Sequence, residues 1–83
     1  METVSVQFRM VSVLKQVARE MGLGDAFTLE LPAGATLAQA MEQAGIPARR
    51  IGRYLNNGKI RMPDYAPVDG EIIDVVPPTI SGG

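Results

Sequence analysis

The residues with the most distinctive chemistry lie at the C-terminal end of the sequence, which closes in Pro77-Pro78-Thr79-Ile80-Ser81-Gly82-Gly83. Because glycine averages ~7% of residues, two terminal glycines are expected by chance in about one chain in 200. A segment without Cβ atoms can lie flat in a narrow channel, and two prolines stiffen the base from which it extends. This pattern favours a carrier whose reactive group is the α-carboxylate of Gly83, activated with ATP inside another protein. A cloning scar or an incidental flexible end is the alternative.

Side chains that could catalyse a reaction are scarce in the rest of the sequence. The 83 residues include no cysteine and no histidine, which excludes a disulfide scaffold, a Cys/His metal site and any mechanism that needs an internal thiol or imidazole. Gly22, Gly24 and Gly34 lack the Gly-Lys-Ser/Thr sequence of a phosphate-binding loop. We therefore expect that the chain binds no cofactor itself and is not a complete enzyme.

The composition is typical of a small globular domain. Hydrophobic residues make up 46% of the chain and charged residues 20%, which is too apolar for a disordered segment. No apolar run approaches the ~20 residues of a membrane span, and no signal sequence follows Met1. We expect one domain in the cytoplasm. The net charge of −1 gives no general reason to expect nucleic acid as a partner.

Two groups of charged residues need an interpretation. The first contains five of the eight cations within a short stretch: Arg49, Arg50, Arg53, Lys59 and Arg61. A solvated face is the favoured interpretation, and a docking patch for an acidic partner or RNA is the alternative; nucleic acid is disfavoured because Tyr54 is the only nearby ring for stacking. The second group consists of Asp64, Asp69, Glu71 and Asp74. We expect structural roles for these carboxylates, with Asp69 as a turn residue.

The first half of the chain predicts a strand, a short helix and a second strand. Hydrophobic residues alternate with polar ones over residues 4–10 and again over residues 27–31, as in half-buried strands. Between them, helical spacing over residues 14–21 follows Ser12, a candidate N-cap, and Gly22 ends the helix. Four methionines fall on expected core faces, where packing is their expected role: Met10, Met21, Met41 and Met62.

The clearest helix signal begins at Thr36. Thr36 and Gln39 have the spacing of a capping box, and Gly45 ends the apolar stripe that starts at Leu37. Further on, Asn57-Gly58 predicts a two-residue hairpin turn between strands 53–56 and 59–62.

The last strand covers residues 71–76, after a turn at Asp69-Gly70 and before the two prolines. Strand, short helix, strand, helix and three strands, in that order, predict an α+β fold in which a mixed sheet packs on one main helix. We identify this as the ubiquitin-like β-grasp. The first and last strands are the most apolar, so we expect them side by side in the centre of the sheet. Residues 1–78 would form the domain and residues 79–83 a flexible tail.

The C-terminal segment 67–83 resembles the end of the MoaD/ThiS family of ubiquitin-like sulfur carriers. The shared features are the Asp69-Gly70 turn, a β-rich strand and a short tail ending in Gly-Gly. The resemblance implies that an activating enzyme related to those of ubiquitin adenylates Gly83 with ATP and Mg²⁺. A sulfur donor would then form a C-terminal thiocarboxylate, which a synthase large subunit uses. The carrier would be a recycled cosubstrate.

Within this family, the Pro-Pro-x-x-Ser-Gly-Gly ending is most similar to the small subunit of molybdopterin synthase. The sequence departs from that subunit in two places. Residues 11–24 are longer than expected, and Val75-Val76 replace the aromatic residues that often precede the prolines. The pathway therefore stays open, with thiamine synthesis and other sulfur-transfer pathways as alternatives. A ubiquitin-like modifier conjugated through Gly83 and a plain β-grasp interaction module are the two other candidate functions.

Carriers of this family contact their partners through an apolar sheet surface near the tail. We expect Ile60, Met62 and Val76 to be partly exposed on the sheet face opposite the main helix, and the resemblance makes Ile60 and Val76 candidate contacts. Burial under the helix is the alternative for these residues, because the sequence alone does not decide which residues of a strand face the helix. The remaining candidate contact residues belong to the end of the chain: Pro77, Pro78, Ile80 and Ser81.

Overall fold

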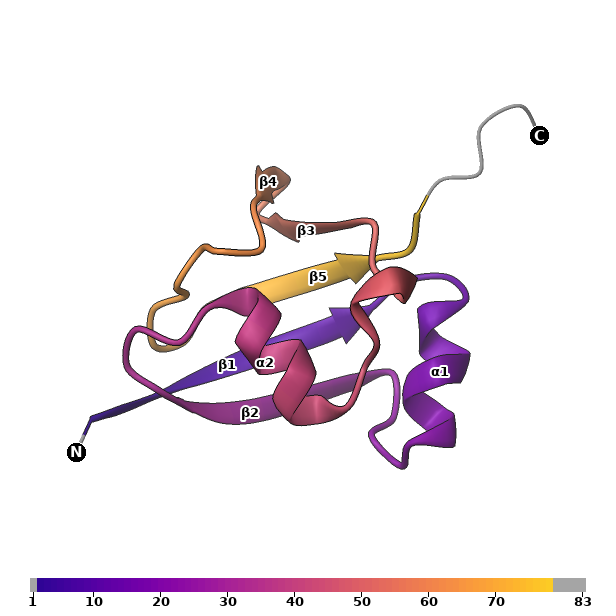
Figure 1. The fold of residues 1–83 in the computed structure, drawn as a ribbon, viewed down its shortest axis with the longest axis horizontal. Coiled ribbons are helices and arrows are strands. Elements are labelled where there is room, and N and C mark those ends of the chain that lie inside the picture. The colour runs from indigo at the N-terminus through magenta and orange to yellow at the C-terminus, as the bar shows by residue number, and fades with distance from the viewer. Residues whose placement is uncertain (1, 79–83) are drawn as a thin grey trace.

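The computed structural model describes residues 2–78. Along these residues the chain forms five strands, two α-helices and one turn of 3₁₀ helix (Figure 1). In chain order the elements are β1 (Thr3–Met10), α1 (Leu14–Glu20), β2 (Ala26–Pro32), α2 (Leu37–Ala44), η1 (Ala48–Arg50), β3 (Arg53–Asn56), β4 (Lys59–Arg61) and β5 (Ile72–Val76). The tail predicted for residues 79–83 lies outside the described residues.

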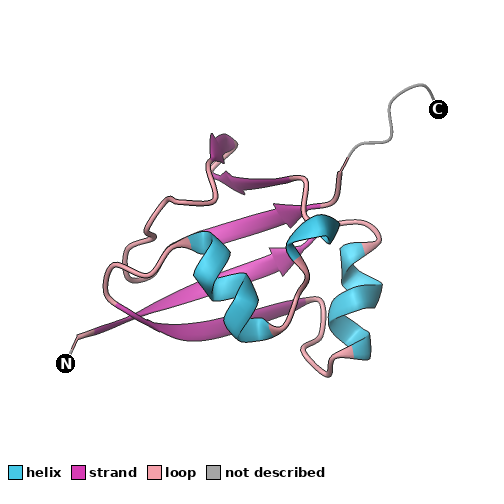
Figure 2. Cartoon of the chain, in the orientation of Figure 1, coloured by secondary structure: helices cyan, strands magenta, loops and turns pink. Residues whose placement is uncertain are grey.

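The five strands form one mixed sheet in the order β2-β1-β5-β3-β4. β1 and β5 are parallel neighbours in its centre, with Phe8 opposite Ile73, so the predicted central pair is confirmed. The other neighbouring strands are antiparallel. α2 covers one face of this sheet (Figure 2), and the arrangement is the predicted β-grasp.

The core lies between α2 and this face of the sheet. The period-two pattern of β1 places Val6, Phe8 and Met10 inward, where they are at most 3% exposed. The Phe8 ring stacks on Phe27 of β2, with the ring centroids 5.9 Å apart. The fully buried side chains with the largest volumes come from the sheet, from α2 and, in the case of Leu14, from α1: Phe8, Leu14, Leu31, Leu37, Met41, Ile73, Val6 and Val75.

The predicted capping box at the start of α2 is confirmed. The Thr36 hydroxyl accepts a hydrogen bond from the Gln39 amide at 3.2 Å, and the Gln39 side-chain oxygen accepts one from the Thr36 amide at 2.9 Å. Gly45 ends the helix with φ of +88°. These local signals fix the length of α2 and therefore which residues it turns toward the sheet.

Some details of the sequence prediction are wrong. Ser12 is not an N-cap, because it has φ of +58° and α1 begins after Val13 without a side-chain cap. Met21 and Met62 are 42% and 65% exposed, because α1 and β4 end one residue before them and the buried pattern ends there too. β5 begins at Ile72, one residue later than predicted, and the turn η1 was not foreseen.

Leu37 allows a direct test of the packing between α2 and the sheet. Its side chain is fully buried, so Leu37→Ala should remove apolar contacts and lower the free energy of unfolding by about 2–5 kcal/mol. Glu42→Ala, at an exposed position of the same helix, should change it by less than about 0.5 kcal/mol. Urea denaturation of the two variants measures both values, and equal stability of the two would contradict the packing described.

Candidate functional site at the end of strand β5

The central strand β5 leads directly into Pro77 and Pro78, which we call the collar. Pro77 is half-buried and Pro78 is exposed. Neither proline can donate a ladder hydrogen bond, so the sheet ends here. The candidate residues Ile80, Ser81, Gly82 and Gly83 lie outside the described residues, and their predicted roles stay predictions.

The segment before β3 holds the base of the collar in place. The Gly52 amide donates a hydrogen bond to the carbonyl of Val76 at 2.7 Å. Arg53 then pairs with Val76 across the β3–β5 ladder. On the other side of the strand, the Val11 amide donates to the carbonyl of Val75 at 3.0 Å. The last residues of β5 are therefore bonded on both sides up to the point where the collar begins.

The sheet face away from α2, which we call the open face, carries an apolar strip near this end of the molecule, interrupted by the exposed Arg53 opposite Val76. Ile60 lies opposite Leu55, Leu55 lies opposite Asp74, and Ile60 is 61% exposed. Val76 is half-buried, and strand alternation places it on the same face as Asp74. The predicted position of Ile60 and Val76 opposite the main helix is thus correct.

An ion pair crosses the middle of the open face. Arg9 of β1 and Asp74 of β5 form two hydrogen bonds, at 2.6 and 3.1 Å. The hydrogen bonding and the charge of Asp74 raise the pKa of the Arg9 guanidinium. The pair borders the apolar strip, because Leu55 lies opposite Asp74.

The five clustered cations lie around η1 and the β3–β4 hairpin. All but Arg61 are exposed, and within residues 2–78 none of them forms a salt bridge, whereas Arg9 and Arg19 each do. The Arg61 guanidinium lies 4.6 Å from the centroid of the Tyr65 ring. The structure therefore places a solvated basic surface beside the segment that holds the collar.

The carboxylates that precede β5 have structural roles. Asp69 accepts a hydrogen bond from the Ser5 amide at 2.7 Å. Glu71 accepts from the Tyr65 hydroxyl and from the Val68 amide, both at 2.8 Å. These bonds fix the loop before β5, as expected for Asp69, and leave these two carboxylates engaged in the fold.

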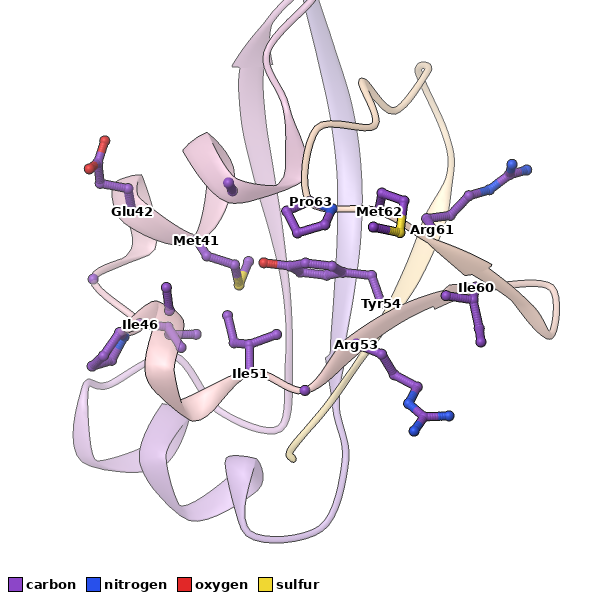
Figure 3. Close-up of a pocket in the computed structure, with 15 residues that line it drawn as sticks. Met41, Glu42, Ile46, Ile51, Arg53, Tyr54, Ile60, Arg61, Met62 and Pro63 are labelled. Atoms are coloured by element: carbon purple, nitrogen blue, oxygen red, sulfur yellow. The ribbon is translucent and has the colours of Figure 1, made fainter. Parts of the chain in front are cut away.

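A groove lies between α2 with η1 and the β3–β4 hairpin, and sequence reasoning missed it (Figure 3). Its volume is about 730 Å³, and Met41, Ile46, Ile51 and Tyr54 are among the side chains that line it. Burial raises the pKa of the Tyr54 hydroxyl. The residues come from four elements that meet only in the fold, so no short motif marks the groove.

Among residues 2–78, no three Cys, His, Asp or Glu side chains gather in a way that could hold a metal ion. In the same part of the chain, no helix is both long and apolar enough to cross a membrane.

The fold and the position of the collar are those of a ubiquitin-like protein. The family model described as Mut7-C ubiquitin (Ub-Mut7C) matches residues 3–81. The chain therefore belongs to the Mut7-C ubiquitin family. A comparison with curated proteins gave no significant match.

Three solved structures share the fold. The HVO 2177 protein of Haloferax volcanii has a TM-score of 0.76 at 18% identity, over 96% of this chain and 88% of its own. A putative molybdopterin converting factor, subunit 1, of Pyrococcus furiosus has a TM-score of 0.72 at 21% identity, over 92% and 99%. SAMP1 of Haloferax volcanii, a small archaeal modifier protein, has a TM-score of 0.72 at 22% identity, over 95% and 99%.

The loop before β5 gives a prediction that depends on pH. The hydrogen bond to Glu71, followed by burial, raises the pKa of Tyr65 above its ordinary value of about 10. Because folding favours the protonated phenol, the contribution of this hydrogen bond to the free energy of unfolding is complete at neutral pH. It is lost as pH rises through the pKa that Tyr65 has in the folded state. Tyr65→Phe should cost about 1 kcal/mol at pH 7, and this difference from the wild type should shrink above pH ~10. Urea denaturation across this pH range measures the difference, and a difference independent of pH would contradict the assigned bond.

Proposed function

We propose that this protein is a sulfur carrier, in which the α-carboxylate of Gly83 becomes a thiocarboxylate that donates sulfur in cofactor biosynthesis. The observation that carries the proposal is the continuity of β5 with the collar. A central strand bonded on both sides leads into two prolines, and three residues separate the prolines from Gly82-Gly83. A rigid domain can therefore present a slim terminus to a partner.

The proposed chemistry uses only the terminal carboxylate. Its oxygen attacks the α-phosphorus of ATP, an acyl adenylate forms and pyrophosphate leaves. Hydrosulfide supplied by a sulfur donor then attacks the acyl carbon, the bond to AMP breaks with AMP as the leaving group, and loss of the S–H proton leaves a C-terminal thiocarboxylate. The absence of cysteine and histidine from the sequence agrees with this chemistry, because no side chain of the carrier needs to react.

The cofactors and partners of the proposal follow from this cycle. ATP and Mg²⁺ belong to an activating adenylyltransferase of the ubiquitin-activating type, and the carrier binds neither by itself. A sulfur donor enzyme and the large subunit of a synthase complete the set. Ile60, Val76 and the collar would contact these enzymes, since they combine exposed apolar surface with proximity to the tail.

Molybdopterin synthesis is the pathway we favour. The Pro-Pro-x-x-Ser-Gly-Gly ending supports it. The shared fold of the Pyrococcus furiosus protein, which is named as a putative molybdopterin converting factor subunit, adds support of a coarser kind.

A ubiquitin-like modifier is the second candidate, and the shared fold of SAMP1 favours it. In that case a target lysine amine, and not sulfur, attacks the activated Gly83 and forms an isopeptide bond. Protein adducts that disappear from cells when Gly82 and Gly83 are deleted would support the modifier. A plain β-grasp interaction module would be unaffected by the same deletion.

Gly82→Ala tests the proposed route of activation. A Cβ next to the terminal residue would meet the wall of a narrow channel, so we expect ATP–pyrophosphate exchange by the activating enzyme to fall about tenfold or more. The control is Thr79→Ala, which keeps both glycines and should leave exchange close to that of the wild type. Removal of Gly83 should abolish exchange. Normal exchange by the Gly82→Ala protein, with an unchanged melting temperature, would contradict channel threading.

Ile60→Asp tests the proposed docking surface. The side chain is 61% exposed, so the substitution should hardly change stability. It should raise the KM of the activating enzyme for the carrier about tenfold, because a charge would be buried in an apolar contact. Val13→Asp is the matched control, at a residue that is 63% exposed and lies beside α1. The same KM for both variants would remove Ile60 from the docking surface.

A further inference from the structure

Gly52 differs from the other glycines of the described part of the chain. Six glycines there have positive φ, which explains their residue type, and Gly52 is not one of them. Its φ lies outside the positive range that favours glycine, so backbone conformation gives no reason for a glycine here. The reason for a glycine must lie in the space around its Cα.

That space is occupied by the collar. A Cβ placed on Gly52 would lie 2.6 Å from the Pro77 carbonyl oxygen and 2.7 Å from both the Pro77 carbonyl carbon and the Pro78 Cα. All three are backbone atoms, which cannot rotate away as the end of a side chain could. Gly52 also lines the groove between α2 and the β3–β4 hairpin.

The contact acts together with a hydrogen bond. The Gly52 amide donates to the carbonyl of Val76 at 2.7 Å, which anchors the residue directly before the collar. Packing of the Gly52 Cα against the next two residues then fixes how the chain leaves the sheet. Pro77 and Pro78 have restricted φ angles, so they cannot easily absorb a shift at this point.

We propose that Gly52 is a positioning residue that sets the direction in which the C-terminal tail leaves the domain. This inference rests on the proposed function, since the direction matters only if the carboxylate must reach a reacting atom in a partner. Five residues beyond the collar span at most about 17 Å, so the position and direction of the collar limit the region that Gly83 can reach. Misplacement of about 1 Å can cost roughly a hundredfold in rate when reacting atoms must be aligned.

The first test compares Gly52→Ala with Gly22→Ala. Gly22 has φ of +81° and open space around its Cα, so its alanine variant strains the backbone without touching the collar. With the activating enzyme saturated with ATP, Gly52→Ala should lower kcat for adenylation about tenfold and raise KM for the carrier much less, because the contact of Ile60 is kept although the collar shifts. Gly22→Ala should lower the melting temperature and change neither constant. An equal loss of kcat in both variants would show that only stability is affected and would overturn the proposal.

A second measurement reads the direction of the tail without any enzyme. The chain contains no cysteine, so Ser81→Cys provides a single site for a nitroxide label. Its broadening of backbone amide NMR signals reports where the tail passes the domain. The set of broadened amide signals should change when Gly52→Ala is added to the labelled protein. It should stay the same when Gly22→Ala is added. An unchanged pattern in Gly52→Ala would overturn the proposal, even if the wild-type protein proved not to be adenylated at all. Failure of adenylation alone would count only against the proposed function.

If Gly52→Ala does not fold, a variant with both collar prolines replaced by glycine tests the same proposal. A flexible collar should spread the nitroxide broadening over more of the surface and lower kcat while Gly52 is intact. In this background, adding Gly52→Ala should have little further effect on kcat, because the collar can move away from the new Cβ. If Gly52→Ala lowered kcat in the combined variant as much as it does with both prolines present, Gly52 would not act through the collar.

Discussion

The parallel pairing of β1 with β5 is the contact on which the remaining structure depends. It joins residues 65 positions apart, such as Arg9 and Asp74, so its loop-closure cost must be offset by burial of the strands in the core. Phe8, Ile73 and Val75 are fully buried there. α2 packs on this pair, and both antiparallel edges of the sheet extend from it. The last strand of the domain is thereby its most central one, and the chain leaves from a firmly held position.

The polar groups around β5 serve this arrangement at both of its ends. At the start of the strand, Asp69 binds the Ser5 amide and Glu71 binds Tyr65, so these carboxylates are part of the loop that sets the register. At the end, Gly52 holds Val76 and approaches the collar. The side chains of the domain thus hold the strand, and under the proposed function the reacting group is the terminal carboxylate. Within the described residues the exposed cations Arg49, Arg50, Arg53 and Lys59 form no salt bridge, and under the proposed function they and Ile60 are available to partner proteins.

Local signals in the sequence predicted most of the fold. The capping box of Thr36 and Gln39 and the turn Asn57-Gly58 each depend on neighbours within three residues, and both are confirmed. Errors arose where a pattern was extended past the end of an element, as at Met21 and Met62, or where backbone conformation overrode residue preference, as at Ser12. The groove and the role of Gly52 could not be predicted, because both arise from segments that are brought together only by the sheet. Of the candidate site, the sequence indicated the open-face position of Ile60 and Val76 correctly, and the tail residues stay predictions.

The central claim concerns the chemistry of Gly83, and intact-mass spectrometry tests it most directly. The protein would be incubated with ATP, Mg²⁺, a sulfide donor and an activating enzyme from the same organism that is shown to be active on a carrier of its own. We predict a mass gain equal to the replacement of one oxygen by sulfur, which is absent when Gly83 is removed. An unchanged mass under these conditions would contradict the sulfur-carrier function and leave the modifier or a simple binding module.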